Sequence, residues 1–134
     1  MQAREIIASH PDVRGNTNDK LIRAIEEMLN CGQVCTSCAD ACLAEEHVSM
    51  LVQCIRLDMD CADLCFTTAR IATRRAGGNV EVIAPLLTAC IEACRRCCDE
   101  CERHAREMDM EHCRICADAC RRCEQACQEA LGSL

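Results

Sequence analysis

The stretch CADACRRCEQAC, residues 116–127, carries cysteines separated by four, three and four positions. The stretches CGQVCTSCADAC, residues 31–42, and CIEACRRCCDEC, residues 90–101, repeat the same spacing. An α-helix completes a turn in about 3.6 residues, so steps of three and four keep one residue type on one face. Each stretch therefore predicts an α-helix with a stripe of thiols along the side that a helical bundle buries.

The rest of the chain predicts four long helices with short connections. A short helical segment ends at Pro11, and Gly77 with Gly78 is expected to end the second long helix. Pro85 should kink the start of the third or make its first turn irregular, and no segment alternates like a β-strand. The expected long helices are residues 18–44, 47–75, 80–107 and 110–131.

Short connections force neighbouring helices to run antiparallel, so the predicted fold class is all-α. We expect an up-down-up-down four-helix bundle with a cysteine-lined core, preceded by a short N-terminal helical segment. Residues 1–134 are expected to form a single domain, made of the N-terminal segment 1–17 and the bundle 18–131.

Composition excludes several classes of protein. The net charge of −7 argues against nucleic acid or an anionic membrane surface as a partner. No stretch approaches the roughly 20 apolar residues of a membrane span, and the N-terminus lacks the pattern of an export signal. We therefore expect a cytoplasmic protein whose cysteines are reduced. Their odd count of 17 cannot pair completely within one chain.

The candidate metal ligands are the cysteines and the residues that continue their stripes. Asp58 stands where the repeat on the second helix predicts a cysteine, and is expected to be a buried acid or weak ligand, or equally a residue that reaches solvent. Cys98 lies beside its stripe. The cysteines are Cys31, Cys35, Cys38, Cys42, Cys54, Cys61, Cys65, Cys90, Cys94, Cys97, Cys98, Cys101, Cys113, Cys116, Cys120, Cys123 and Cys127.

Core packing and disulfide formation explain the stripes poorly. A single buried cysteine behaves as a small hydrophobic residue, but stripes of them on four helices fill a core less well than leucine. Cysteines four residues apart on a helix have Cβ atoms ~5–6 Å apart, beyond the ~3.8 Å of a relaxed disulfide. Pairing between helices after oxidation in air remains open.

Metal binding fits better, and charge favours a monovalent ion. Thiolates select Cu(I), zinc or iron–sulfur clusters. The stripes contain no Lys or Arg, so zinc held by four thiolates would leave about two uncompensated negative charges per site. The spacing matches neither an iron–sulfur motif nor the Glu-x-x-His pairs of di-iron bundles. Cu(I), bound in many sites along the bundle axis, is the expected ion.

The segments CGQVCTSCADAC, CADLC, CIEACRRCCDEC and CRICADACRRCEQAC make the chain resemble the cytosolic copper storage proteins of bacteria over about residues 18–131. The resemblance implies storage of many Cu(I) ions, mostly on pairs of thiolates, without catalysis, and assembly as a homotetramer. The alternative function is general binding and detoxification of zinc or another thiophilic metal. A second apolar stripe on the second helix is a candidate subunit interface, unless it packs within the bundle. That stripe is Val52, Ile55, Met59, Ala62 and Phe66.

Antiparallel helices also sort the other residues by end. One end is expected to be an apolar plug, and the other to collect His47, Met50, His104, Met108, Met110 and His112. Imidazole and thioether exchange Cu(I) more readily than a thiolate pair, so copper is expected to enter and leave there. His104 and His112 are the candidate ligands, ahead of His47. The competing explanation is that these are ordinary helix-end residues.

Overall fold

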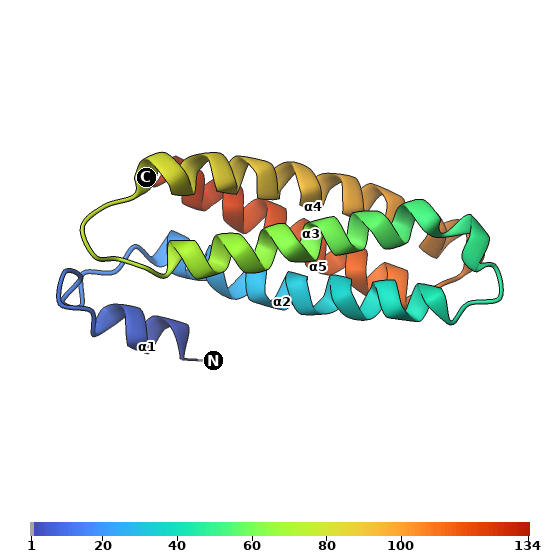
Figure 1. Cartoon of the computed structure of the whole chain (residues 1–134), viewed down its shortest axis with the longest axis horizontal. Coiled ribbons are helices and arrows are strands. Elements are labelled where there is room, and N and C mark those ends of the chain that lie inside the picture. Colours follow the sequence, from blue (N-terminus) through green and yellow to red (C-terminus); the bar gives the residue numbers. More distant parts are fainter. Residues whose placement is uncertain (1) are drawn as a thin grey trace.

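In the computed structural model of this chain, which describes residues 2–134, four long α-helices run antiparallel in sequence order (Figure 1). The elements are α1 (Ala3–Ala8), α2 (Asp19–Leu43), η1 (Val48–Met50, a 3-10 turn), α3 (Val52–Ala72), α4 (Val80–Met108) and α5 (Glu111–Gly132). No strand occurs in residues 2–134. The predicted all-α four-helix bundle is confirmed.

Each long helix packs against two neighbours. Helix α2 contacts α3 and α5, and α4 contacts the same two helices, so one face of every helix lines a common axis. The α2–α3 and α4–α5 connections lie at one end of the bundle, which we call the histidine end (Figure 1). The α3–α4 connection lies at the other end, the closed end, where α1 packs against α2.

Helix α3 is shorter than the expected helix 47–75. The chain makes the turn η1 first, buries Leu51 completely, and only then begins α3 at Val52. At the other end α3 stops at Ala72, so the expected end at the glycine pair is wrong. Gly77 instead shapes the α3–α4 loop, where its φ of 63° is a conformation that glycine adopts without strain.

Local sequence explains the other helix ends. The Asn18 side chain accepts a hydrogen bond from the Leu21 backbone N–H at 3.0 Å and so forms the N-cap of α2. Helix α4 continues through Pro85. Met110 occupies the N-cap position of α5. Asp109 ends α4 with a left-handed φ of 53°, which aspartate tolerates better than most residues, and so reverses the chain within a short connection.

Aliphatic side chains seal the closed end. Ile22, Ile83 and Leu87 are fully buried there, and Ile7 of α1 belongs to the same buried cluster. An Asp12 carboxylate oxygen accepts the Gly77 backbone N–H at 2.9 Å, which ties the N-terminal segment to the α3–α4 loop. The predicted apolar plug is present and is covered by the first residues of the chain.

Gly32 allows α2 and α3 to approach each other closely. A Cβ atom at this position would lie 2.8 Å from two carbons of the Phe66 ring. Such a distance is below van der Waals contact, so the ring rests on the bare backbone of α2.

Gly32→Ala is expected to destabilise the reduced, metal-free protein by about 1 kcal/mol. Overpacking costs about 1–3 kcal/mol, and the better helix propensity of alanine returns about 1 kcal/mol. Urea unfolding measures the difference. Gly78→Ala is the control, because its Cβ would meet nothing within 4 Å. A Gly32→Ala variant more stable than wild type would show that the Phe66 ring imposes no constraint.

Candidate metal centre

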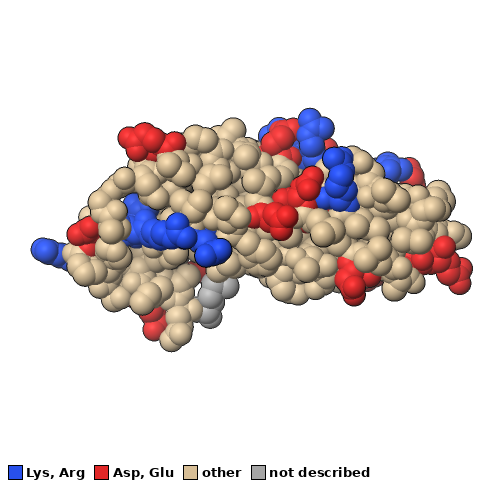
Figure 2. All heavy atoms as spheres, viewed as in Figure 1, with Lys and Arg blue, Asp and Glu red and all other residues tan. Residues whose placement is uncertain are grey.

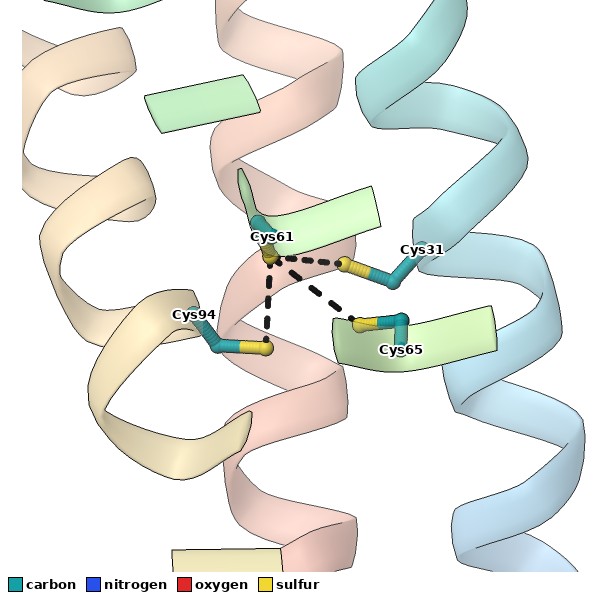
Figure 3. Close-up of side chains that lie close together, drawn as sticks. All are labelled: Cys31, Cys61, Cys65 and Cys94. Carbon is teal, nitrogen blue, oxygen red and sulfur yellow. Dashed lines mark hydrogen bonds between the residues drawn. The ribbon is translucent and has the colours of Figure 1, made fainter. Parts of the chain in front are cut away.

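The thiols of all four long helices meet along the bundle axis. The Cys31 sulfur of α2 lies 3.8 Å from that of Cys120 on α5 and 4.0 Å from that of Cys61 on α3. The Cys61 sulfur lies 3.7 Å from that of Cys94 on α4. Figure 3 shows Cys31, Cys61, Cys65 and Cys94 converging from three helices. All 17 cysteines are buried free thiols.

The thiols form overlapping groups rather than one isolated site. In each group the ligand atoms lie within 4.8 Å of one another, and a cysteine such as Cys31 belongs to two groups. Shared sulfurs of this kind suit clusters in which a thiolate bridges two ions. The groups include Cys31–Cys61–Cys65–Cys94, Cys31–Cys35–Cys61–Cys120, Cys35–Cys97–Cys116–Cys120, Cys65–Cys90–Cys94–Cys123 and Cys38–Cys42–His112–Cys113.

Thiols one helical turn apart also face each other. The sulfur–sulfur distance is 3.8 Å for Cys31 and Cys35 and 4.0 Å for Cys61 and Cys65. A disulfide requires about 2.05 Å. Two bonds of about 2.3 Å to one ion bring sulfurs to within about 4.6 Å. The spacing is therefore suited to an ion between the thiols and is reached without moving the helices.

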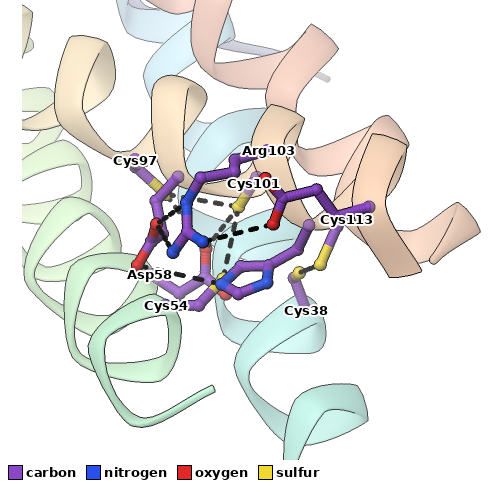
Figure 4. Close-up of polar contacts among 10 residues, drawn as sticks. Cys38, Cys54, Asp58, Cys97, Cys101, Arg103 and Cys113 are labelled. Atoms are coloured by element: carbon purple, nitrogen blue, oxygen red, sulfur yellow. Dashed lines mark hydrogen bonds and ion pairs between the residues drawn. The ribbon is translucent and has the colours of Figure 1, made fainter. Parts of the chain in front are cut away.

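Asp58 interrupts the thiol stripe of α3 and is completely buried, so the expectation that it reaches solvent is wrong. Its Oδ1 accepts hydrogen bonds from the thiols of Cys97 at 2.9 Å, Cys116 at 3.3 Å and Cys101 at 3.5 Å, whereas its Oδ2 has no partner. Figure 4 shows Asp58 beside Cys54, Cys97 and Cys101. Burial raises the pKa of Asp58 to about 8.

The hydrogen-bonded thiols differ in how readily they lose a proton. Hydrogen bonds to Cys116 and other thiols, together with burial, raise the pKa of Cys120 well above its usual value. Hydrogen bonds from Cys120 and Cys31 lower the pKa of Cys61, because they stabilise a thiolate there. The thiols of the column are therefore not equivalent in acidity.

Cys98 stands apart from this network. Its only side-chain polar contact within residues 2–134 is the Arg121 guanidinium, at 3.6 Å. Burial raises the pKa of Cys98, and the charge of Arg121 partly opposes that shift. The position one residue beside the stripe thus turns the thiol toward the outer edge of the α4–α5 contact.

His112 reaches the thiols at the histidine end. Its Nδ1 lies 3.3 Å from the Cys38 sulfur and 3.7 Å from the Cys113 sulfur. The Cys38 and Cys113 sulfurs are 3.9 Å apart, and Figure 4 shows them together. His112 is partly exposed, so this group of ligands has a member at the surface.

His104 is buried, as its place on the α4 stripe predicts, and neither ring nitrogen has a hydrogen-bond partner. Met110, which directly precedes α5, is also buried, and Met108 is partly buried. His47 and Met50 are exposed. The structure thus separates the predicted set into inward residues on α4 and α5 and outward residues on the α2–α3 connection.

Two glutamates beside the imidazoles were not predicted. A Glu45 carboxylate oxygen lies 3.1 Å from Nε2 of His112, and a Glu100 carboxylate oxygen lies 3.8 Å from Nε2 of His104. Glu100 was recognisable four residues before His104 on one helix. Glu45 lies 67 residues from His112, so only the fold brings them together.

Charged side chains otherwise stay outside the core. On the face seen in Figure 2, acidic and basic residues are interspersed over the surface. Many form pairs along one helix, such as Arg114 with Glu111, and these are solvent-exposed. Asp58 is the only buried Asp, Glu, Lys or Arg in residues 2–134. The thiol column therefore contains no built-in positive charge to balance thiolates.

Known proteins match this chain over most of its length. The family model described as copper storage protein matches residues 17–132. The copper storage protein Ccsp from Streptomyces lividans, loaded with 10 copper equivalents, superposes with a TM-score of 0.92 and 49% identity, covering 98% of this chain and 99% of that one.

Two further comparisons agree. The cytosolic copper storage protein from Streptomyces lividans with five coppers has a TM-score of 0.83 and 53% identity, covering 87% of this chain and 95% of that one. The uncharacterised cysteine-rich protein YhjQ of Bacillus subtilis (strain 168) is 33% identical over 104 residues, which cover 78% of this chain and 89% of that protein. Within residues 2–134, no helix combines the length and hydrophobicity needed to cross a bilayer.

Asp58→Asn is expected to change how stability depends on pH. From about pH 4 to about pH 8, Asp58 is ionised in the unfolded chain but protonated in the folded one, so the unfolded state binds fewer protons. The free energy of unfolding of the wild type therefore falls as pH rises through this window, and asparagine removes that contribution. The variant should gain stability relative to wild type with rising pH.

Urea unfolding of the reduced, metal-free proteins at several pH values measures this difference. Asp60→Asn, an exposed carboxylate on the same helix, is the matched control. A stability difference between Asp58→Asn and wild type that stays constant across the window would contradict the assignment of a protonated buried acid.

Proposed function

The chain belongs to the copper storage protein family, and we propose that it sequesters many Cu(I) ions on the thiolates that line its bundle. The observation that carries this proposal is the continuous column of overlapping thiol groups. A protein that handles one ion at a time needs one or two such groups. Shared sulfurs along an axis provide many equivalent positions, which is the requirement of a store.

Charge supports Cu(I) over divalent ions. The thiols of the column become ligands by losing protons, and each thiolate left in the interior needs a compensating charge. A monovalent soft ion supplied for each thiolate restores neutrality, whereas zinc held by four thiolates leaves negative charge behind. General zinc binding or detoxification is therefore not favoured, and we propose no catalytic activity.

We propose that every cysteine except Cys98 contributes to the column of ligands. Within residues 2–134 the Cys98 thiol makes no hydrogen bond to another thiol and contacts Arg121 instead, so we assign it a place outside the copper core. Asp58 acts as an acceptor for thiol hydrogen bonds rather than as a ligand, since a hard carboxylate is a poor partner for Cu(I).

We propose that copper is loaded and released at the histidine end. Aliphatic side chains block the closed end. At the histidine end, His112 lies between solvent and the Cys38 and Cys113 thiols, and the buried His104 has two unpartnered ring nitrogens. Imidazoles there can pass an ion from the surface to the first thiolates.

The relative described as a cytosolic copper storage protein supports a proposal about where this protein works. We propose that it works in the cytoplasm, as a single-domain subunit of a homotetramer. On α3, Val52 and Met59 are largely exposed and Phe66 is partly exposed, which supports an interface between subunits along this helix.

Anaerobic titration of the fully reduced protein with Cu(I), against a strong competing chelator, tests storage. Uptake should continue to roughly one ion per core thiol, because that ratio neutralises the thiolates. Helicity should be present before the first addition. Uptake that ends after one or two ions, or equal competition by zinc, would refute the proposal. Cys97→Ala should lower the capacity, whereas Cys98→Ala, its neighbour on the same helix, should leave it unchanged.

Replacing the histidines tests the route. His104→Ala and His112→Ala should slow both loading and chelator-driven removal at least several-fold while total capacity stays constant, since the column itself is intact. Stopped-flow transfer from a coloured Cu(I)–chelator complex gives the rates. His47→Ala is the matched control, because His47 is exposed at the same end. Unchanged rates in the double variant would eliminate the histidine route.

A further inference from the structure

The Glu45 carboxylate is the outer member of a three-part contact. Its oxygen lies 3.1 Å from Nε2 of His112, and the opposite ring nitrogen, Nδ1, lies 3.3 Å from the Cys38 sulfur. Within residues 2–134, Glu45 makes no other side-chain hydrogen bond or ion pair. The imidazole thus bridges a carboxylate at the surface and a thiol in the core.

This arrangement decides which ring nitrogen of neutral His112 carries the proton. A carboxylate only accepts hydrogen bonds, so Nε2 must be the N–H donor toward Glu45. The lone pair of Nδ1 then faces the Cys38 and Cys113 thiols. With the opposite tautomer, Nδ1 would present a hydrogen where an incoming cation needs a lone pair.

We propose that Glu45 is a positioning residue that fixes the His112 tautomer and ring orientation so that Nδ1 receives Cu(I). The role rests on the proposed function, because it presumes that copper passes this imidazole. A carboxylate behind a ligating imidazole also raises its basicity and is worth about 10- to 100-fold in metal affinity in other proteins.

The backbone holds Glu45 in register with the thiols. Its N–H donates to the carbonyl of Cys42 at 3.2 Å, in the turn that ends α2. Cys42 belongs to the same group of ligands as Cys38, His112 and Cys113. The turn therefore fixes the backbone of Glu45 beside the group whose imidazole its carboxylate contacts.

His104, the buried imidazole of the histidine end, lacks such a partner. Glu100 lies 3.8 Å from His104 Nε2, beyond hydrogen-bonding distance, and Arg103 holds Glu100 through two guanidinium nitrogens at 2.6 and 3.0 Å. Of these two imidazoles, only His112 has a carboxylate within hydrogen-bonding distance, and its opposite ring nitrogen lies within hydrogen-bonding distance of thiols.

Nitrogen NMR of the reduced, copper-free protein tests the tautomer directly. In protein labelled with ¹⁵N-histidine, at a pH where His112 is neutral, its ring signals should report a protonated Nε2 and a bare Nδ1. Glu45→Ala should convert this to a mixture of tautomers. Glu46→Ala removes the same charge from the adjacent exposed residue and should leave the spectrum of His112 unchanged.

Competition titrations then test the consequence for copper. Glu45→Ala should weaken binding of the first Cu(I) by about 10-fold or more, with total capacity unchanged, whereas Glu46→Ala should behave as wild type. In a His112→Ala background, Glu45→Ala should have no further effect, because it acts through that imidazole.

The outcomes separate this inference from the proposed function. A single Nε2–H tautomer that persists in Glu45→Ala, or equal copper effects of Glu45→Ala and Glu46→Ala, would overturn the positioning role while leaving storage intact. A protein that binds no copper at all would overturn storage, and the copper-free spectra would still show whether Glu45 sets the tautomer.

Discussion

The interior of a small helical bundle does not tolerate uncompensated charge, and this constraint governs the whole molecule. Neutral thiols satisfy it, and so does Asp58, whose pKa burial raises to about 8. A thiolate satisfies it only with a cation beside it. A core of thiols can therefore be folded without metal and still accept soft monovalent ions, provided that protons leave as the ions arrive. The arginine–glutamate pairs remain at the surface, where water screens them.

Helical periodicity determines where the thiols lie. Steps of three and four residues put thiols in a line, and four antiparallel lines facing one axis bring sulfurs from different helices to 3.5–4.0 Å of one another. Specificity for a soft ion then needs no specialised loop. The same regularity makes departures from it informative. Asp58 and Cys98 break the pattern, and each lies in an environment unlike that of the cysteines on the stripes.

The sequence was sufficient for the fold class, the order of the long helices and the buried thiol stripes, because all three follow from residue spacing. The ends of α3 were mispredicted, since burial of Leu51 and the shape of the Gly77 loop depend on contacts made by the folded chain. Spacing alone also left open whether Asp58 was buried. The contact between Glu45 and His112 joins the α2–α3 connection to the first turn of α5, far away in sequence, so no local pattern could reveal it.

The aliphatic plug at the closed end gives the column a direction. Ile22, Ile83 and Leu87 are buried at that end, so ions that enter at the histidine end would fill the column from the closed end upward and leave in the reverse order. Ions that travel deepest are the first to arrive and the last to depart, so the protein would hold a fast-exchanging fraction near the histidines and a slow reserve beneath it. The depth at which an ion is bound would then reflect when it was loaded, and a brief shortage of copper would release only the ions loaded last.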